Sequence, residues 1–352
     1  MGKNPNPKRK RYKISFVILL ILMAVTFYII FNEFEYNHIV NEITGSSHKF
    51  HLLFAGLLAV FYLMLYGRFI RISTKALGET TSHFKCFVYG CADFFYSAIT
   101  PSSTGGQPAV IYFMAKDGLS YSTSAITVIL QTISFKVVLL LYGGLSLFFI
   151  KDIILDSGAL FQVLIFAGAA LTVVMIAVCL VSMYFSRLTL FFGRAVISFL
   201  GRIHLVRNPD LRLKTFEKAL FEYREAAFYI KGKRKLLLHL VVVTFLQRTA
   251  MFSIAFFVYR SFGLFEFGLI ELLCLQAVIA LAVDSIPLPG GIGANEYAMF
   301  FMYENIYGVD SILPAAAMLL TRGFSYYFTL IVSSIFSLGK QAVMHFGKKK
   351  AI

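Results

Sequence analysis

Long apolar runs separated by short polar stretches make up most of this chain. A helix crosses the hydrocarbon core of a bilayer with about 20 apolar residues. By length and composition, we predict membrane-spanning helices over 14–31, 49–70, 120–150, 159–184, 236–259 and 312–338. The first run is longer than the core of a signal peptide and no small-residue cleavage site follows it, so we interpret it as an uncleaved span.

Two other apolar regions, 86–115 and 267–307, are each interrupted by prolines and glycines. The first interruption runs from Ile99 to Pro108 and the second from Ile286 to Glu296. Irregular backbone at membrane depth is costly unless it is buried in protein or lines a wet cavity. A matching pair of interrupted segments, one in each half of a chain, is typical of transporter binding sites. The pair therefore predicts a central binding site.

The composition agrees with a membrane location. Only 14% of the 352 residues are charged and 58% are hydrophobic, whereas a soluble domain carries roughly 25% charged residues. The net charge of +15 is explained by the preference of Lys and Arg for cytoplasmic loops, so it does not indicate a nucleic-acid partner. The four cysteines form no CxxC pair, and there is no Walker A motif. We therefore expect no metal, no cofactor and no consumption of ATP by this chain.

The positions of Lys and Arg set the expected orientation. Of the 33 Lys and Arg, six lie in 1–13, four in 68–85, twelve in 185–235 and four from Lys340 onward. Under the positive-inside rule, these regions face the cytoplasm. We therefore predict a multi-pass protein of the cell membrane with both termini in the cytoplasm.

The same rule predicts how the two interrupted regions are placed. The first arm of 86–115 is short for a crossing, so we predict a re-entrant hairpin that enters from the cytoplasm. If 267–286 crossed inward, residues 287–311 would form a cytoplasmic loop without any Lys or Arg, so a hairpin entering from outside fits better. The predicted fold class is an all-α polytopic helix bundle with two inverted span–hairpin–span units, 49–150 and 236–338. The alternative is ordinary short helices with two extra crossings in each region.

We predict that the chain is divided into three regions. A basic N-terminus (1–13) precedes a single polytopic membrane domain (14–340), and a basic cytoplasmic tail (341–352) ends the chain. Within the membrane domain, the cytoplasmic loop 185–235 is expected to hold amphipathic helices. The basic N-terminus is expected to contact anionic lipids of the inner leaflet.

Six ionisable residues fall within the expected membrane segments, where each costs roughly 2.5–3.5 kcal/mol on insertion scales. They are Asp93, Lys136, Arg248, Asp284, Glu296 and Arg322. The cations are expected to attract an anionic head group, and the carboxylates to bind a coupled proton or a cationic group, with Asp93 in the coupling role. The amides of Gln131 and Gln247 can add contacts. The alternative is that the charged residues form buried ion pairs that lock the bundle.

The two interruptions supply the other candidate substrate-binding residues. A second helix begins after each interruption, so its N-terminal N–H groups and positive dipole end are expected to aim at the bilayer centre. Glycines let a phosphate approach the backbone closely. The candidates are Pro101, Gly105, Gly106, Gln107, Pro108, Pro287, Pro289, Gly290, Gly291 and Gly293. A kink that serves packing alone is the alternative.

These motifs resemble the membrane domain of the lysylphosphatidylglycerol synthetase/flippase family, including its free-standing members without a synthetase. The resemblance rests on Ile99 to Pro108, Ile111-Tyr112, Lys116-Asp117-Gly118 and Pro287 to Gly293 with Glu296. It implies movement of phospholipids, including aminoacylated phosphatidylglycerol, between leaflets, and through that a role in resistance to cationic antimicrobial peptides. The chain ends at Ile352, where a fused aminoacyltransferase domain would follow, so lysyl transfer is not expected.

The expected substrate and partner is therefore an anionic or aminoacylated membrane phospholipid. Two other classes stay open. A phosphatidylglycerol lysyltransferase would take its lysyl group from Lys-tRNA and would need a nucleic-acid surface that we do not find in the sequence. A small-solute carrier of inverted-repeat design would need a cavity closed to the lipid side. A homo-oligomer or a separate synthetase partner is compatible with the sequence.

Overall fold

A computed structural model of the chain describes residues 48–100, 103–185, 232–284, 286, 288–308 and 312–347, together with single positions and short stretches of two or three residues between 41 and 45 and between 190 and 228. The predicted first span, the basic N-terminus and most of the predicted amphipathic loop lie outside the described residues.

The described residues are helical and contain no strand. Five helical segments are long and apolar enough to cross a membrane. They are α3 (Phe50–Ala76), α6 (Tyr121–Phe149), α8 (Gly158–Tyr184), α11 (Arg234–Ser261) and the continuous segment α14, η3 and α15 (Leu313–Arg322, Gly323–Phe328 and Thr329–Gly347). These segments coincide with five of the predicted spans. The prediction of an all-α polytopic membrane protein is confirmed.

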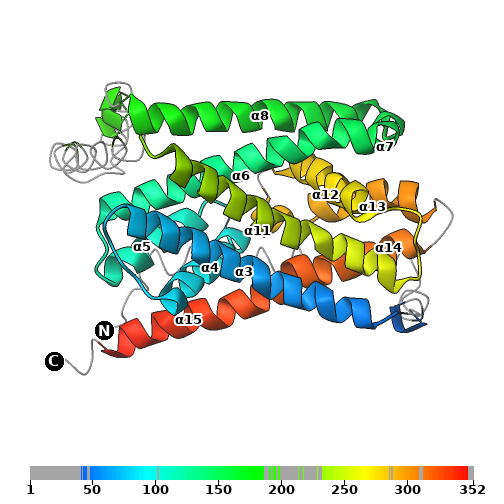
Figure 1. Ribbon diagram of the computed structural model, residues 1–352, viewed down its shortest axis with the longest axis horizontal. Helices are drawn as coiled ribbons and strands as arrows, with labels where there is room; N and C mark the ends of the chain where they lie inside the picture. Colours follow the sequence, from blue (N-terminus) through cyan, green and yellow to red (C-terminus); the bar gives the residue numbers. More distant parts are fainter. Residues whose placement is uncertain are drawn as a thin grey trace, which may run out of the picture.

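Each of the two interrupted regions forms a pair of shorter helices. The first helix pair is α4 (His83–Ala98) and α5 (Gly106–Lys116). The second helix pair is α12 (Leu269–Val283) and α13 (Ala294–Tyr307), with the short 3₁₀ turn η2 (Pro289–Gly291) between them. The first pair lies toward the left of Figure 1 and the second toward the right. Their re-entrant placement and their inverted relation stay predictions.

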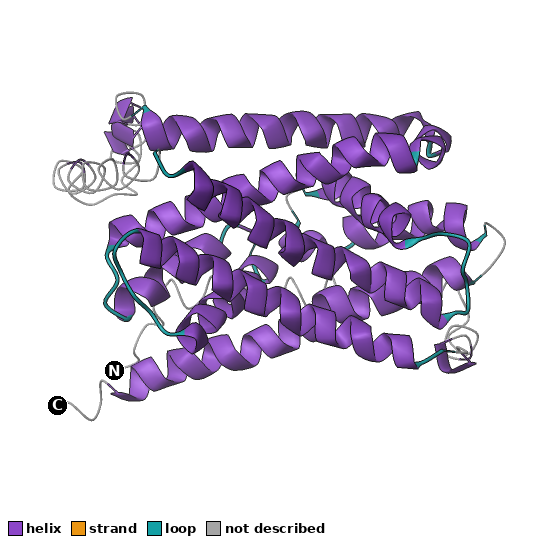
Figure 2. Ribbon diagram, viewed as in Figure 1, coloured by secondary structure: helices purple, strands orange, loops and turns teal. Residues whose placement is uncertain are grey.

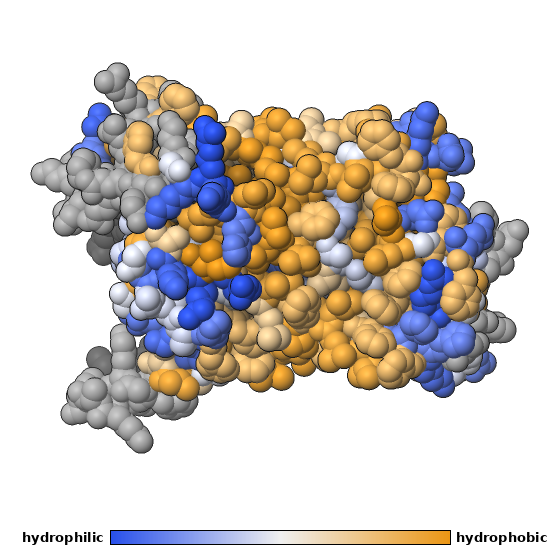
Figure 3. Space-filling view, in the orientation of Figure 1, coloured by the Kyte–Doolittle hydropathy of each residue, from blue (hydrophilic) through white to orange (hydrophobic). Residues whose placement is uncertain are grey.

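The surface of the bundle is apolar around its middle. Figure 3 shows a broad hydrophobic band across the molecule, with hydrophilic residues gathered at the two ends. Much of α8 contributes to such a surface, because large side chains such as Leu160, Val163 and Phe166 are 59–77% exposed. An exposed apolar surface of this extent is suited to lipid rather than to water. The loops drawn in Figure 2 gather mainly at the two ends.

We call the end of the bundle where α3 ends and α11 begins, at the left of Figure 1, the lysine-rich end. Lys75 lies in the last turn of α3, Lys116 ends α5, and Lys233 precedes α11. At this end, contacts join segments that are far apart in the sequence. Lys233 Nζ donates a hydrogen bond to the carbonyl oxygen of Ala76 at 3.3 Å, and Lys340 Nζ lies 2.5 Å from the carboxylate of Asp117.

Polar residues that begin helices are also found at this end. The Ser82 hydroxyl accepts a hydrogen bond from the backbone N–H of Lys85 at the start of α4, and Ser120 does the same for Thr123 at the start of α6. Such residues satisfy N–H groups that have no partner inside the helix. The Glu79 carboxylate accepts further hydrogen bonds from Ser120 and Thr123. The loop before α4 is thereby fixed to the start of α6.

Candidate functional site

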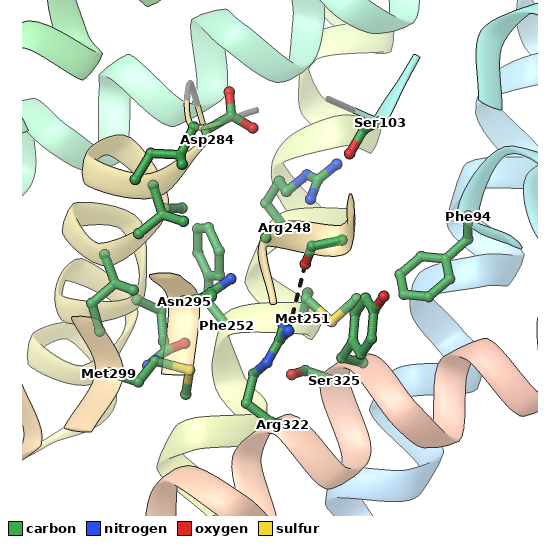
Figure 4. Close-up of a pocket in the computed structure, with 18 of the residues that line it drawn as sticks. Phe94, Ser103, Arg248, Met251, Phe252, Asp284, Asn295, Met299, Arg322 and Ser325 are labelled. Atoms are coloured by element: carbon green, nitrogen blue, oxygen red, sulfur yellow. Dashed lines mark hydrogen bonds between the residues drawn. The ribbon is translucent and has the colours of Figure 1, made fainter. Parts of the chain in front are cut away.

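Each helix pair turns at its interruption, and we call this turn the tip of the pair. The two tips meet in the interior. Ala98 and Ile99 of the first pair share one buried cluster with Ile292 of the second and with Tyr326 of the last span. A cavity of about 240 Å³ lies at this junction. Ser103 lines it from the first interruption, and so do residues of the second interruption and of several long helices. Figure 4 shows Ser103, Arg248 and Arg322 directed into this space.

The second interruption is built from glycines in a left-handed conformation. Gly290, Gly291 and Gly293 have φ angles of 60°, 66° and 86°, which favour glycine because other residues are strained there. Gly290 also lacks space for a side chain, because a Cβ there would collide with the hydroxyl of Tyr326. The backbone turns sharply, and α13 then begins at Ala294.

A buried ion pair fixes this second tip. Arg322 Nε donates to Glu296 Oε1 at 2.7 Å, and the two side chains are only 6% and 4% exposed. Glu296 Oε2 accepts a hydrogen bond from the N–H of Gly293 at 2.7 Å, and Arg322 Nη2 also reaches the carbonyl oxygen of Gly290 at 3.5 Å. The pair therefore joins the last span to the start of α13. Breaking such a pair leaves an uncompensated buried charge, which is costly.

The first interruption is held by a threonine. Thr100 Oγ1 donates to the carbonyl oxygen of Tyr96 at 2.7 Å and accepts from the N–H of Gly105 at 2.8 Å. Helix α5 begins at Gly106. A Cβ on Gly106 would lie only 2.6 Å from Asp93 Oδ1, so this carboxylate is packed against the helix start.

The second helix of each pair, α5 or α13, therefore begins beside a carboxylate of the protein itself. Asp93 lies at the start of α5, and Glu296 lies at the start of α13. Each placement is electrostatically favourable, because the N-terminal end of a helix carries a partial positive charge. An external anion at either helix start would meet one of these carboxylates.

The three predicted cations have different surroundings. Lys136 of α6 forms an ion pair with Asp284, which lines the cavity from the end of α12. Arg322 is paired with Glu296. Arg248 of α11 forms no ion pair with any carboxylate of the described residues.

Arg248 is instead surrounded by aromatic rings. Its guanidinium lies 3.9 Å from the ring centre of Phe135 and 5.4 Å from that of Tyr62. Its Nε is buried and has no hydrogen-bond partner among the described residues. Cation–π contacts stabilise an arginine but leave its N–H groups available for an acceptor. Arg248 therefore differs from Lys136 and Arg322, because it has no ion-pair partner among the described residues and its buried Nε–H has no acceptor there.

A pair of buried amides lies on α6 and α11. Gln131 Nε2 donates to Gln247 Oε1 at 3.2 Å. The other amide atoms, Gln131 Oε1 and Gln247 Nε2, have no partner among the described residues. Neither residue lines the cavity itself.

The predicted site residues divide into several groups. Arg248, Asp284, Gly290, Gly291 and Arg322 line the cavity. Others stand behind the cavity or beside it, namely Asp93, Gly105, Gly106, Lys136, Gly293 and Glu296.

Two further predicted residues do not line the cavity. Gln107 and Pro108 are exposed, and Gln107 Nε2 donates to Thr132 Oγ1 at 2.8 Å. Pro101 and Pro287 lie outside the described residues, and of Pro289 only the backbone is described, within η2.

Aromatic and small polar residues of the lining were missed by the sequence analysis. Tyr62, Phe135 and Tyr326 surround the two arginines, and Ser103 and Asn295 add polar atoms. With 19 Tyr and 38 Phe in the chain, no local pattern separates these aromatic residues from those that pack helices. Within the described residues, no group of three His, Cys, Asp or Glu is placed to hold a metal ion.

Residues 13–333 match the family described as the lysylphosphatidylglycerol synthase TM region. The chain belongs to this family. The match covers both helix pairs and the cavity that lies between their tips. A UPF0104 membrane protein of Archaeoglobus fulgidus is 25% identical over 306 residues, which cover 82% of this chain and 85% of the relative. The resemblance inferred from the paired motifs is confirmed, and the family indicates a membrane role related to lipids.

Proposed function

We propose that the protein moves an anionic or aminoacylated phospholipid, such as lysylphosphatidylglycerol, between the leaflets of the cell membrane. The observation that carries the proposal is the position of Arg248. This cation lines a cavity at the junction of the two interruptions and has no carboxylate ion-paired with it among the described residues. In this proposal a lipid phosphate is the ion-pair partner of Arg248.

Electrostatics favour an anion in this position. A charge that is removed from water is costly unless it is paired. Lys136 and Arg322 have protein carboxylates as partners, so they keep their charge balance without a ligand. Among these three cations, Arg248 is stabilised most when a head-group phosphate enters the cavity. Its guanidinium then receives both a counter-charge and a hydrogen-bond acceptor.

Asp93 is the proposed coupling residue. Its carboxylate lies at the start of α5, within electrostatic range of Arg248. A phosphate beside Arg248 disfavours a second negative charge nearby, so binding of the lipid and protonation of Asp93 support each other.

The orientation and the physiological role belong to the same proposal. We infer that the lysine-rich end faces the cytoplasm, following the preference of Lys and Arg for that side. Delivery of a cationic lipid to the outer leaflet lowers the negative surface potential there and so repels cationic antimicrobial peptides.

Translocation by the purified protein in liposomes tests the proposal. Fluorescent phosphatidylglycerol and its lysyl derivative are compared for wild type, Arg248→Gln and a matched control, Arg68→Gln. Arg68 is exposed on α3 and does not line the cavity. We expect head-group-selective transport that Arg248→Gln abolishes and Arg68→Gln preserves. Failure of folded wild-type protein to transport either lipid contradicts the proposal, and so does full transport by folded Arg248→Gln.

A further inference from the structure

Two buried polar atoms on the lining of the cavity have no hydrogen-bond partner among the described residues. One is Nε of Arg248 and the other is the hydroxyl of Tyr326. Tyr326 is 5% exposed, so bulk water does not satisfy its hydroxyl. Buried polar groups in native proteins are nearly always paired, so an exception on the wall of a cavity indicates a partner inside the cavity, either water or a ligand.

The local fold places Tyr326 at the second interruption. The residue belongs to η3, a π-helical stretch that interrupts the last span directly after Arg322. Single π-helical turns inside α-helices occur frequently at functional sites. The Tyr326 ring lies beneath the Arg322 guanidinium, 4.3 Å from ring centre to Cζ. Its hydroxyl fills the place that a side chain of residue 290 would take. The ring is packed between these two neighbours, and its hydroxyl has no hydrogen-bond partner among the described residues.

We propose that Tyr326 is a ligand-binding residue that donates a hydrogen bond to a phosphodiester oxygen whose charge Arg248 neutralises. This inference rests on the proposed function and deepens it. A phosphodiester carries one negative charge and two non-bridging oxygens. The cavity offers one cation without an ion-pair partner and one hydroxyl without a partner among the described residues, which matches that chemistry.

The charge of Arg248 discriminates against an ammonium ligand in this part of the cavity. Arginine has no acceptor atom and repels a positive charge. The lysyl ammonium of an aminoacylated lipid therefore does not bind beside Arg248 and Tyr326. This part of the cavity recognises the phosphate that anionic and aminoacylated phosphatidylglycerol share.

Binding of short-chain lipids by the full chain in detergent tests the role of Tyr326. The probe is dihexanoylphosphatidylglycerol, and dihexanoylglycerol is the analogue without phosphate. Tyr326→Phe removes only the hydroxyl. Tyr142→Phe is the matched control, because Tyr142 is 2% exposed, bonds Thr249 through its hydroxyl and does not line the cavity.

We expect Tyr326→Phe to bind dihexanoylphosphatidylglycerol about tenfold more weakly, as for loss of one hydrogen bond to a charged group. Tyr142→Phe is expected to retain wild-type affinity. Unchanged affinity in folded Tyr326→Phe, with a loss in Arg248→Gln, overturns the role of Tyr326 and leaves the proposed function standing. No preference of the wild type for the phosphate-bearing probe overturns both.

A change on the ligand gives a second test that does not depend on the folding of a variant. The phosphorothioate analogue has one non-bridging oxygen replaced by sulfur, which is a weaker acceptor. If Tyr326 and Arg248 bind different oxygens, the two diastereomers bind the wild type with unequal affinities. Equal affinities overturn the assignment of Tyr326 to one oxygen.

Discussion

The first and second helix pairs meet at one cavity but are fixed at different places. In the second pair, the ion pair of Glu296 with Arg322 lies at the tip, beside three glycines with positive φ. In the first pair, the ion pair of Asp117 with Lys340 lies at the lysine-rich end, and the tip is held by the Thr100 hydroxyl. Two interruptions that look alike in the sequence are therefore held by different chemistry.

This difference indicates which tip responds to a ligand. The second tip is cross-linked to the last span by two buried charges, so movement there requires an ion pair to break. The first tip depends on neutral hydrogen bonds, and its carboxylate, Asp93, is within electrostatic range of Arg248. We therefore expect ligand-linked movement to be larger at the first tip.

The largest effect is expected from breaking the ion pair of the second tip. Glu296→Gln leaves Arg322 buried without a counter-charge and is expected to lower the free energy of unfolding by about 3–5 kcal/mol. Asp93→Asn is expected to cost less, because Asp93 forms no ion pair with any of the described residues. Denaturant unfolding of both variants in detergent measures the difference.

A double variant separates loss of the pair from loss of one charge. Glu296→Gln with Arg322→Met removes both charges, and we expect it to recover much of the lost stability. If the double variant is as unstable as Glu296→Gln alone, the cost does not arise from an uncompensated Arg322. If Asp93→Asn is the more harmful single change, the contrast between the two tips is wrong.

The next largest loss of stability is expected from a change in the backbone of the second tip. Gly290→Ala places a side chain at a φ of 60° and against the Tyr326 hydroxyl, so we expect a loss of about 1–3 kcal/mol in the free energy of unfolding. Gly144→Ala is the control, because Gly144 lies within α6 with open space around it. Alanine is favoured over glycine in a helix, so this change is expected to be neutral or stabilising. Equal effects of the two substitutions would mean that the second tip does not need its glycine.

The sequence was sufficient to predict five of the six expected spans and the two interruptions, and the first expected span lies outside the described residues. Hydrophobic length identifies the spans and prolines with glycines identify the interruptions, because both depend on residues that are neighbours in the chain. The ionisable residues of the membrane segments could also be named in advance, since each is costly there.

The sequence alone did not predict how those charges pair. Lys136 and Asp284 are 148 positions apart, and only the packing of α6 against α12 brings them together. From the sequence alone, Lys136, Arg248 and Arg322 are equivalent candidates, and nothing indicates which of them lacks an ion-pair partner. The π-helical stretch that carries Tyr326 leaves no local signal either, because its residues are typical of a membrane helix.

The smallest of these effects is expected at the lysine-rich end of the first helix pair. Burial alone would raise the pKa of Asp117, but hydrogen bonds from Lys340 and Tyr89 and the charge of Lys340 outweigh it and lower that pKa below its usual value. A carboxylate with a lowered pKa stabilises the folded state above its unfolded pKa, about 3.9 for Asp, and this contribution is lost as the pH falls through the folded pKa. Asp117→Asn is therefore expected to cost about 1 kcal/mol at neutral pH.

The pH dependence distinguishes this ion pair from a packing effect. The difference in thermal unfolding between wild type and Asp117→Asn is expected to shrink as the pH is lowered from neutral to below about 4, the ordinary pKa range of Asp. Asp152→Asn is the control, because Asp152 is exposed in α7 (Lys151–Asp156) and forms no ion pair with the described residues. A difference for Asp117→Asn that stays constant with pH would show that the carboxylate acts through its shape alone. The ion pair of Asp117 with Lys340 would then not stabilise the first helix pair. The two helix pairs would differ only in the interactions at their tips.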